Sequence, residues 1–201
     1  MNKIINYLLD FIFPPNKYEI ELRNIDKNEI YNRYSFKNLI NSSVYPYQNP
    51  LIKELVWQIK YKKNRKAIEI AGYSLYLELI KLNEPLLLIP IPISSKRRKE
   101  RGYNQCELMI DEIIKLDEQN IFAKNYNLLI RETHIDKQTH KNRKDRIINT
   151  KNIFKISNQT DISNKIVIID DVTTTGSTLN EAKKCLIEAG YNNIITLTLA
   201  H

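Results

Sequence analysis

The chain has 201 residues, with 31 Lys and Arg against 23 Asp and Glu, so its formal net charge is +8. Hydrophobic residues make up 42% and charged residues 27%, which is ordinary for a folded globular protein and excludes global disorder. Only two cysteines occur, Cys106 and Cys185, which excludes a disulfide-dense scaffold and a four-cysteine zinc site within these residues. The positive charge suits nucleic acid, phosphorylated metabolites or a membrane surface, without choosing among them.

The first twelve residues predict a short amphipathic helix, which Pro14 and Pro15 stop. Asn6 and Asp10 interrupt its apolar run and no small-residue cleavage site follows, so a docking helix is favoured over a signal peptide. No segment approaches the roughly 20 apolar residues of a membrane helix. We therefore expect a cytoplasmic protein.

Residues 16–49 are charged and rich in Asn and Tyr, without a clear period. We expect residues 16–49 to be weakly structured, residues 1–49 to form an N-terminal appendage, and residues 50–201 to form the main domain. From residue 51 on, helical patterns alternate with buried strands, which predicts an α/β fold with a mainly parallel sheet, and residues 132–151 are a long polar loop or arm. The predicted helices are 51–59, 67–79, 103–116 and 177–189, and the predicted strands are 86–93, 126–131, 153–156, 165–171 and 194–199.

The most informative stretch is residues 168–179, where a buried strand ends in Asp170 and Asp171 and a Thr/Gly/Ser loop then opens a helix. Ligands of open α/β sheets bind at the carboxyl ends of strands. Small hydroxyl residues at a helix N-terminus form a phosphate cradle, and the two carboxylates suit sugar hydroxyls or a hydrated Mg²⁺. The alternative is a purely structural helix cap. The whole string favours a phosphorylated sugar.

This string resembles the signature of type I phosphoribosyltransferases. Residues 89–94 and 98–105 are similar to the Pro-x-Pro and Arg-Gly-Phe-Asn-Gln segment of the ComF family, and residues 55–61 resemble its Lys-Tyr-containing helix. The resemblance runs from about residue 50 to the end of the chain. The family's spaced Arg, Gln, Arg, Asn and Phe pattern is matched by Arg131, Gln138, Arg146, Asn149 and Phe154.

The resemblance implies the type I phosphoribosyltransferase fold with a small N-terminal appendage. It also implies a transferase that binds phosphoribosyl pyrophosphate with Mg²⁺ and passes phosphoribose to an acceptor that the sequence does not name. Asp170 and Asp171 would hold the ribose hydroxyls and, through water, the Mg²⁺. Arg98, Arg101 and Gly102 would hold pyrophosphate, with Arg101 and Gly102 beginning a helix. The 5′-phosphate would lie on Thr173, Thr174, Thr175, Gly176, Ser177 and Thr178, and a lid would carry Gln138, Arg143 and Arg146, unless that arm is only a solvated loop.

Three features depart from the family pattern. Phe13-Pro14-Pro15 is present, but no cysteine follows it in residues 16–49, so we expect no zinc. Thr174 stands where some phosphoribosyltransferases carry a carboxylate base. Cys106 follows the Arg-Gly-Tyr-Asn-Gln run, near the expected site, although packing is its more usual role. The histidines, His134, His140 and His201, show no metal-ligand spacing.

The alternative hypothesis is a non-enzymatic accessory module for DNA uptake in natural competence, as the family name implies. It would bind single-stranded DNA or a competence helicase through its positive charge, including the basic run 62–66 and the polar arm. The sequence shows no dedicated stacking platform, although Tyr61, Tyr73 and Tyr103 leave one open. It does not decide the oligomeric state.

Overall fold

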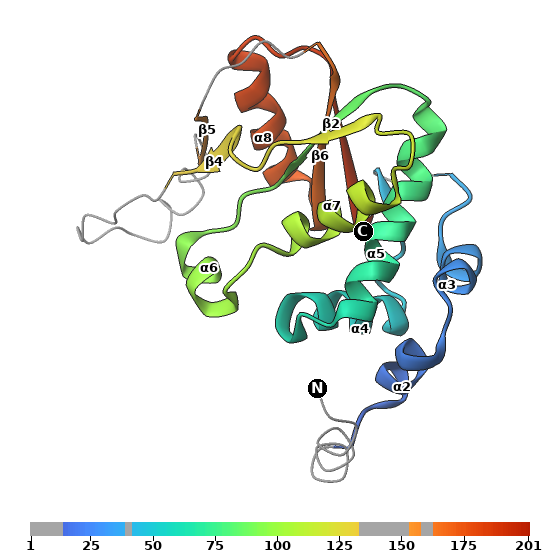
Figure 1. Cartoon of the computed structure of the whole chain (residues 1–201). Helices are drawn as coiled ribbons and strands as arrows, with labels where there is room; N and C mark the ends of the chain where they lie inside the picture. The colour runs from blue at the N-terminus through green and yellow to red at the C-terminus, as the bar shows by residue number, and fades with distance from the viewer. Residues whose placement is uncertain (1–13, 39–41, 133–152, 158–162) are drawn as a thin grey trace, which may run out of the picture.

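The computed structural model describes residues 14–38, 42–132, 153–157 and 163–201, in which five strands form one sheet with helices on both faces (Figure 1). The strand order is β1-β7-β6-β2-β3, and every neighbouring pair is parallel. This confirms the expected α/β class and is consistent with the type I phosphoribosyltransferase fold. The strands are β1 Ser43–Tyr45, β2 Leu86–Pro90, β3 Phe122–Lys124, β6 Lys165–Val172 and β7 Ile194–Ala200.

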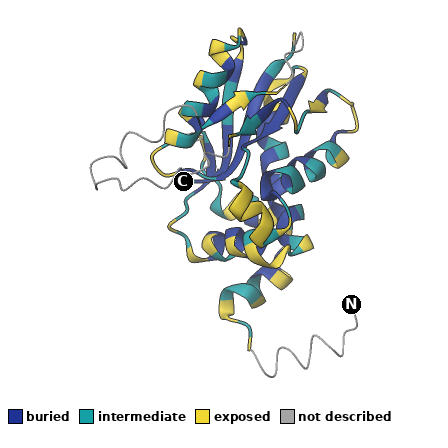
Figure 2. Cartoon of the chain, turned by 90° about the vertical axis from the view of Figure 1, so that its left-hand side faces the viewer, coloured by how far each residue is buried: buried dark blue, intermediate teal, exposed yellow. Residues whose placement is uncertain are grey.

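The two faces of β6 belong to two separate cores. Val167 and Ile169 pack under α4, α5 and α7, whereas Ile166 and Ile168 pack under α8 and the antiparallel pair β4–β5. Because both faces are covered, residues 166–169 of β6 are all apolar rather than alternating with polar residues. Figure 2 shows the middle of the sheet as buried. These elements are α4 Pro50–Trp57, α5 Arg65–Leu79, α7 Gln105–Leu116, α8 Ser177–Glu188, β4 Leu129–Arg131 and β5 Phe154–Ile156.

The expectation that residues 16–49 are weakly structured is wrong. Two helices begin there with capping side chains, Asn16 and Asp26, and they place Leu22 and Ile30 in the main core. Each helix buries only one of its residues, which is too few for a sequence period to be visible. Strand β1 from the same region pairs with β7. The boundary between residues 49 and 50 itself stays a prediction. The helices are α2 Lys17–Asn24 and α3 Lys27–Tyr34.

The predicted helix 103–116 is preceded by a second helix that the sequence analysis missed, α6 Ser95–Arg101. Arg101 therefore ends a helix, and the expectation that Arg101 and Gly102 begin one is wrong. Gly102 closes α6 with φ +79°, a left-handed conformation that glycine adopts without steric cost.

Three other differences concern strands. β2 ends at Pro90 rather than at residue 93. The Ile91 N–H still donates to the Ile169 carbonyl at 2.9 Å, but Pro92 has no N–H to continue the ladder. β3 was not predicted, since only Phe122 of its three residues is buried and it shows no apolar run. Within the predicted strand 126–131 only β4 is extended, and it pairs with β5 outside the main sheet.

Helices α5 and α7 approach each other closely at Gly72. A Cβ atom on Gly72 would lie 2.5 Å from the Cβ of Glu112. The glycine therefore sets the distance between the two helices that cover one face of the sheet.

The predicted helix over residues 1–12 lies outside the described residues. Within the described ranges, no helix is long and apolar enough to cross a membrane.

Candidate functional site

The connections of β2 and β6 place a topological switch point between these two strands. β2 leads through α6 and α7 to β3 on one side, whereas β6 leads through α8 to β7 on the other. Ligands of open α/β sheets bind outside the carboxyl ends of strands at such a point. Asp170 and Asp171 lie there, near the end of β6, as the sequence predicts.

Both carboxylates of this acidic pair are buried, with exposed fractions of 9% for Asp170 and 4% for Asp171. Asp170 Oδ1 accepts hydrogen bonds from the Asp171 backbone N–H at 2.8 Å and from Cys106 Sγ at 3.6 Å. Burial, together with the neighbouring Asp171 carboxylate, raises the pKa of Asp170 to about 7. Burial also raises the pKa of the Cys106 thiol well above its ordinary value, so that Cys106 remains a proton donor to Asp170. Cys106 is fully buried, and so combines the packing role with a contact to the site.

Lys60 completes this arrangement and was missed as a site residue by the sequence analysis. Its ammonium lies 3.1 Å from Asp171 Oδ2, and only 21% of its side chain is exposed. The lysine comes from the π-helical turn η1 Gln58–Lys62, which continues α4. Single π-helical turns are rare and are often found at functional sites. The sequence signal that could have identified Lys60 was the Lys-Tyr element within residues 55–61.

The acidic pair fits one mode of Mg²⁺ binding. No group of three or more His, Cys, Asp or Glu side chains in the described part of the chain could hold a metal ion. Mg²⁺ commonly keeps several waters and binds through one or two carboxylates plus substrate phosphates. Asp171 Oδ2 has no hydrogen-bond partner within the described residues, although the Lys60 ammonium lies 3.1 Å from it as an ion pair. That buried oxygen is a suitable ligand for water-mediated or direct coordination, in competition with the Lys60 ammonium.

The loop after β6 has the features of an anion site. Gly176 begins α8 with φ +73° and no capping side chain, whereas each of the described helices α2 to α7 begins with an Asn, Asp or Ser cap. The Ser177 N–H donates to Thr175 Oγ1 at 3.4 Å, whereas the following first-turn amides and the positive end of the helix dipole remain available to an anion. Beside the loop lies a cavity of about 310 Å³. It is lined by Ser42, Thr173, Thr174, Thr175, Gly176, Leu179, Asn180, Thr196 and His201.

The predicted phosphate residues divide between this cavity and the helix. Thr173, Thr174, Thr175 and Gly176 line the cavity, whereas Ser177 and Thr178 form the first turn of α8. Asn180 and His201 are lining residues that the sequence analysis did not assign. His201 directly follows β7, and its Nδ1 lies 3.2 Å from the carbonyl oxygen of Thr173. This contact forms because the end of β7 lies beside the loop.

The predicted pyrophosphate residues lie on and after α6. The Arg98 guanidinium pairs with Glu107 at 3.0 Å, whereas Arg101 donates to the amide oxygen of Gln105 at 2.8 Å. In the described residues, no hydrogen bond or ion pair joins either arginine to the acidic pair. The predicted lid residues Gln138, Arg143 and Arg146, with His134 and His140, lie outside the described residues.

The Arg-Gly-Tyr-Asn-Gln segment ties α6 to the rest of the site. Tyr103 Oη donates to the carbonyl of Ile59 in η1 at 2.7 Å, and Asn104 Nδ2 donates to the carbonyl of Ile91, just after β2, at 3.0 Å. Asn104 also caps α7. These contacts hold the turn after α6 against both η1 and the end of β2.

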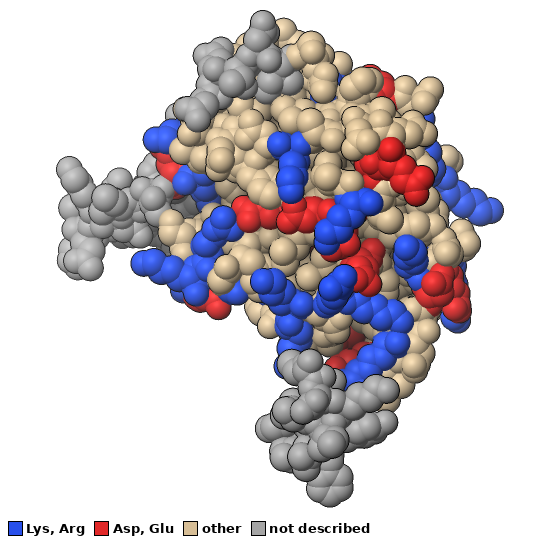
Figure 3. Space-filling model, viewed as in Figure 1, with Lys and Arg blue, Asp and Glu red and all other residues tan. Residues whose placement is uncertain are grey.

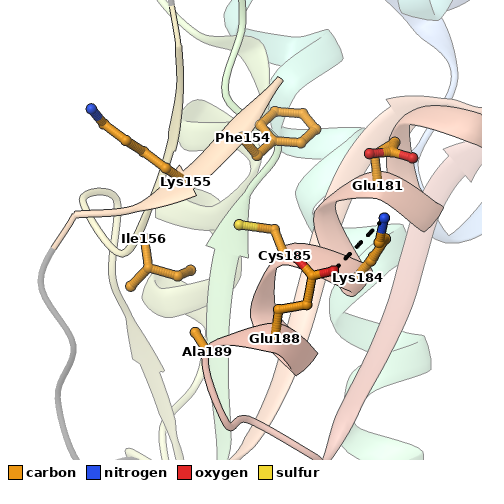
Figure 4. Close-up of a pocket in the computed structure, with 8 residues that line it drawn as sticks. All are labelled: Phe154, Lys155, Ile156, Glu181, Lys184, Cys185, Glu188 and Ala189. Atoms are coloured by element: carbon orange, nitrogen blue, oxygen red, sulfur yellow. Dashed lines mark ion pairs between the residues drawn. The ribbon is translucent and has the colours of Figure 1, made fainter. Parts of the chain in front are cut away.

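A second cavity, of about 340 Å³, lies between β5 and α8 (Figure 4). Cys185 and Phe154 line it, and Lys184 forms an ion pair with Glu188 at 3.7 Å along its helical wall. None of the predicted site residues lines this cavity. The candidate site is therefore the switch point and the loop after β6.

The comparisons with known proteins point to one family. The chain is 31% identical over 152 residues to competence protein ComFC of Bacillus subtilis, 36% identical over 122 residues to competence protein F of Haemophilus influenzae, and 30% identical over 151 residues to ComFC of Streptococcus pneumoniae. These matches cover 75%, 59% and 75% of this chain, and 59%, 52% and 64% of the respective relatives. The chain therefore spans between about half and two thirds of the length of these relatives. No family model matches it.

Proposed function

Because this chain belongs to the ComF family, we propose that it binds phosphoribosyl pyrophosphate with Mg²⁺ and transfers phosphoribose to an acceptor. One observation carries the proposal. The buried pair Asp170 and Asp171 and the uncapped start of α8 lie within one strand–loop–helix unit at the switch point of the sheet. A sugar phosphate has both groups that such a unit recognises, hydroxyls and a dianion.

In this proposal the loop from Thr173 to Thr178 holds the 5′-phosphate through first-turn amides and hydroxyls. Asp170 and Asp171 accept hydrogen bonds from the ribose hydroxyls and stabilise the positive charge that develops at the sugar when pyrophosphate departs. Bound Mg²⁺ supplies neutralisation of the pyrophosphate charge. Lys60, beside Asp171, limits the negative charge of the pair before the ligand arrives.

The leaving group and the acceptor involve different residues. Arg101 is better placed than Arg98 to hold pyrophosphate, because a neutral amide binds Arg101 whereas the Glu107 carboxylate already pairs with Arg98. Thr174 cannot act as a base at neutral pH. The acceptor must therefore arrive as a nucleophile or be activated by another group.

Thermal unfolding tests the proposal. Phosphoribosyl pyrophosphate with Mg²⁺ should raise the melting temperature, since a ligand at 100 times its Kd adds about 2.7 kcal/mol to the free energy of unfolding. Asp170→Asn/Asp171→Asn should abolish the gain, measured against the same variant without ligand. No increase for the unmodified chain at millimolar ligand would contradict the proposal.

A second candidate function is a competence-related role in handling single-stranded DNA or a helicase partner. Its support is the competence names of the relatives and the distribution of charge. Figure 3 shows Lys and Arg side chains gathered on the face that carries α6 and η1. Binding of a labelled single strand should weaken steeply between 50 and 200 mM salt, because the affinity comes from phosphate contacts. Absence of binding at low salt would exclude the DNA branch of this candidate.

A further inference from the structure

Three aromatic side chains and three cations gather around η1 and form what we call the aromatic–cationic patch. The Trp57 and Tyr61 rings lie 5.9 Å apart, centroid to centroid, at an angle of 45°. One cation lies over each ring of the patch, with distances of 5.2 to 5.3 Å to the ring centroid. The pairs are Lys62 over Trp57, Lys63 over Tyr103 and Arg101 over Tyr61.

The patch exposes its aromatic surface to solvent. Trp57 is 42% exposed and Tyr61 is 61% exposed, and they are the two aromatic residues among the exposed large hydrophobic side chains of the described chain. A single exposed apolar residue is ordinary, but two in contact, surrounded by cations, form a surface suited to a planar ligand.

The cations of the patch are not neutralised by carboxylates. Arg101, Lys62 and Lys63 form no ion pair within the described ranges, whereas Arg98, on the same helix as Arg101, pairs with Glu107. Their charge is therefore available to phosphate groups.

The patch is also held in place before any ligand binds. The Tyr103 hydrogen bond to the Ile59 carbonyl, 2.7 Å, joins the turn after α6 to η1, and the Gln105 amide holds the Arg101 guanidinium at 2.8 Å. A prearranged surface loses less conformational entropy when it binds a ligand. Lys63, with φ +48°, ends η1 and turns the chain beside Tyr103.

We infer that the aromatic–cationic patch binds unpaired nucleobases, which stack on Tyr61 and Trp57 while neighbouring phosphates contact Arg101, Lys62 and Lys63. The patch adjoins the acidic pair, since Lys60 of the same turn reaches Asp171 at 3.1 Å. An unpaired base has two sources: a free base that serves as the acceptor of the transfer and uses the aromatic rings alone, or the bases of a single strand, whose phosphates also contact the cations. The inference rests on the proposed function only for the choice between these sources.

Trp57 is the only tryptophan of the chain, so its fluorescence reports directly on the patch. The full chain is titrated with a thymidylate 15-mer, with an abasic strand of the same length, and with free adenine and uracil. The thymidylate should quench Trp57 and bind about 10-fold or more tightly than the abasic strand, because stacking is sequence-tolerant but needs a base. Quenching by a free base alone identifies the acceptor as the source, and quenching by the strand alone identifies single-stranded DNA.

Two substitutions at Tyr61 provide the matched test, because this exposed side chain is replaceable without disturbing the core. Tyr61→Phe keeps the ring and should keep the affinity, whereas Tyr61→Leu should lose about 5-fold or more. Tyr73→Leu is the control, since Tyr73 has Lys27 over its ring, 4.6 Å away, outside the patch. The control should bind like the unmodified chain.

The inference is overturned if thymidylate and the abasic strand bind equally, no base quenches Trp57, and Tyr61→Leu behaves like the unmodified chain. The thermal shift with phosphoribosyl pyrophosphate and Mg²⁺ separates this failure from failure of the proposed function. If only the patch inference is wrong, the shift persists while the quenching is absent. If only the proposed transferase function is wrong, the quenching persists while the shift is absent.

Discussion

Asp170→Asn should stabilise the folded chain at neutral and alkaline pH. Burial and the Asp171 carboxylate raise the pKa of Asp170 from an ordinary 3.8 to about 7. The folded state therefore holds this proton more tightly than the unfolded state, and the free energy of unfolding decreases as the pH rises from about 4 to about 7. Asparagine keeps the Oδ1 atom that accepts from the Asp171 N–H and Cys106, but it cannot become charged.

The magnitude follows from the two pKa values. Each pKa unit corresponds to about 1.36 kcal/mol, so ionised Asp170 lowers the stability of the fold by about 4 kcal/mol. Between pH 5 and pH 8 the loss is about 2–3 kcal/mol. For a chain of this size, that difference corresponds to about 5–10 °C in melting temperature.

The assay is urea and thermal unfolding of both proteins between pH 5 and pH 8, with Glu118→Gln as the control because it makes the same charge change at an exposed position. The stability advantage of Asp170→Asn should grow with pH, and the control should show no such growth. If Asp170→Asn is no more stable than the unmodified chain at pH 8, or if its advantage does not depend on pH, the reasoning from burial and like charge is refuted.

Three further substitutions test the packing around the site. Lys60→Met should lower the free energy of unfolding, measured in urea, by about 2–4 kcal/mol, since it leaves the buried Asp171 carboxylate without its counter-ion. The double variant Lys60→Met/Asp171→Asn should recover most of this loss. If it recovers none, the lost ion pair is not the cause of the destabilisation. Gly72→Ala should lower the free energy of unfolding by about 1–3 kcal/mol although alanine favours helix more than glycine does, because the alanine Cβ would collide with the Cβ of Glu112. A higher melting temperature for this variant would show that α5 and α7 move apart without cost. Gly102→Ala should cost about 1–2 kcal/mol from left-handed strain alone, as nothing lies within 4 Å of the added Cβ, and calorimetry showing no loss would contradict the assigned φ of +79°.

The elements found from the sequence are those whose signal is local. The β-branched run before Asp170, the acidic pair and the small-residue loop are contiguous, and the apolar face of α8 repeats at helical spacing. Helices α2, α3 and α6 were missed because none of them shows a wide apolar stripe, and α6 buries no residue at all. Their sequence signals lay at their ends, in capping residues such as Asn16 and Ser94 and in Gly102 after α6.

The same distinction between local and long-range signals applies to the candidate site. The sequence located Asp170, Asp171 and the loop, because a strand end followed by a helix start is readable residue by residue. It did not locate Lys60, whose contact with Asp171 joins two segments far apart in the chain. It also assigned Arg101 to a helix start, although the left-handed Gly102 makes it a helix end.

By itself, the sequence determined the α/β class, the central strand β6, and the acidic pair and hydroxyl-rich loop at its carboxyl end, since each depends on residues that are neighbours along the chain. Only the tertiary structure decided that η1 brings Lys60 to the buried acidic pair and places Trp57, Tyr61 and Arg101 together on one surface. The physical reason is that burial and long-range electrostatic contacts arise from packing between elements, which no local period encodes.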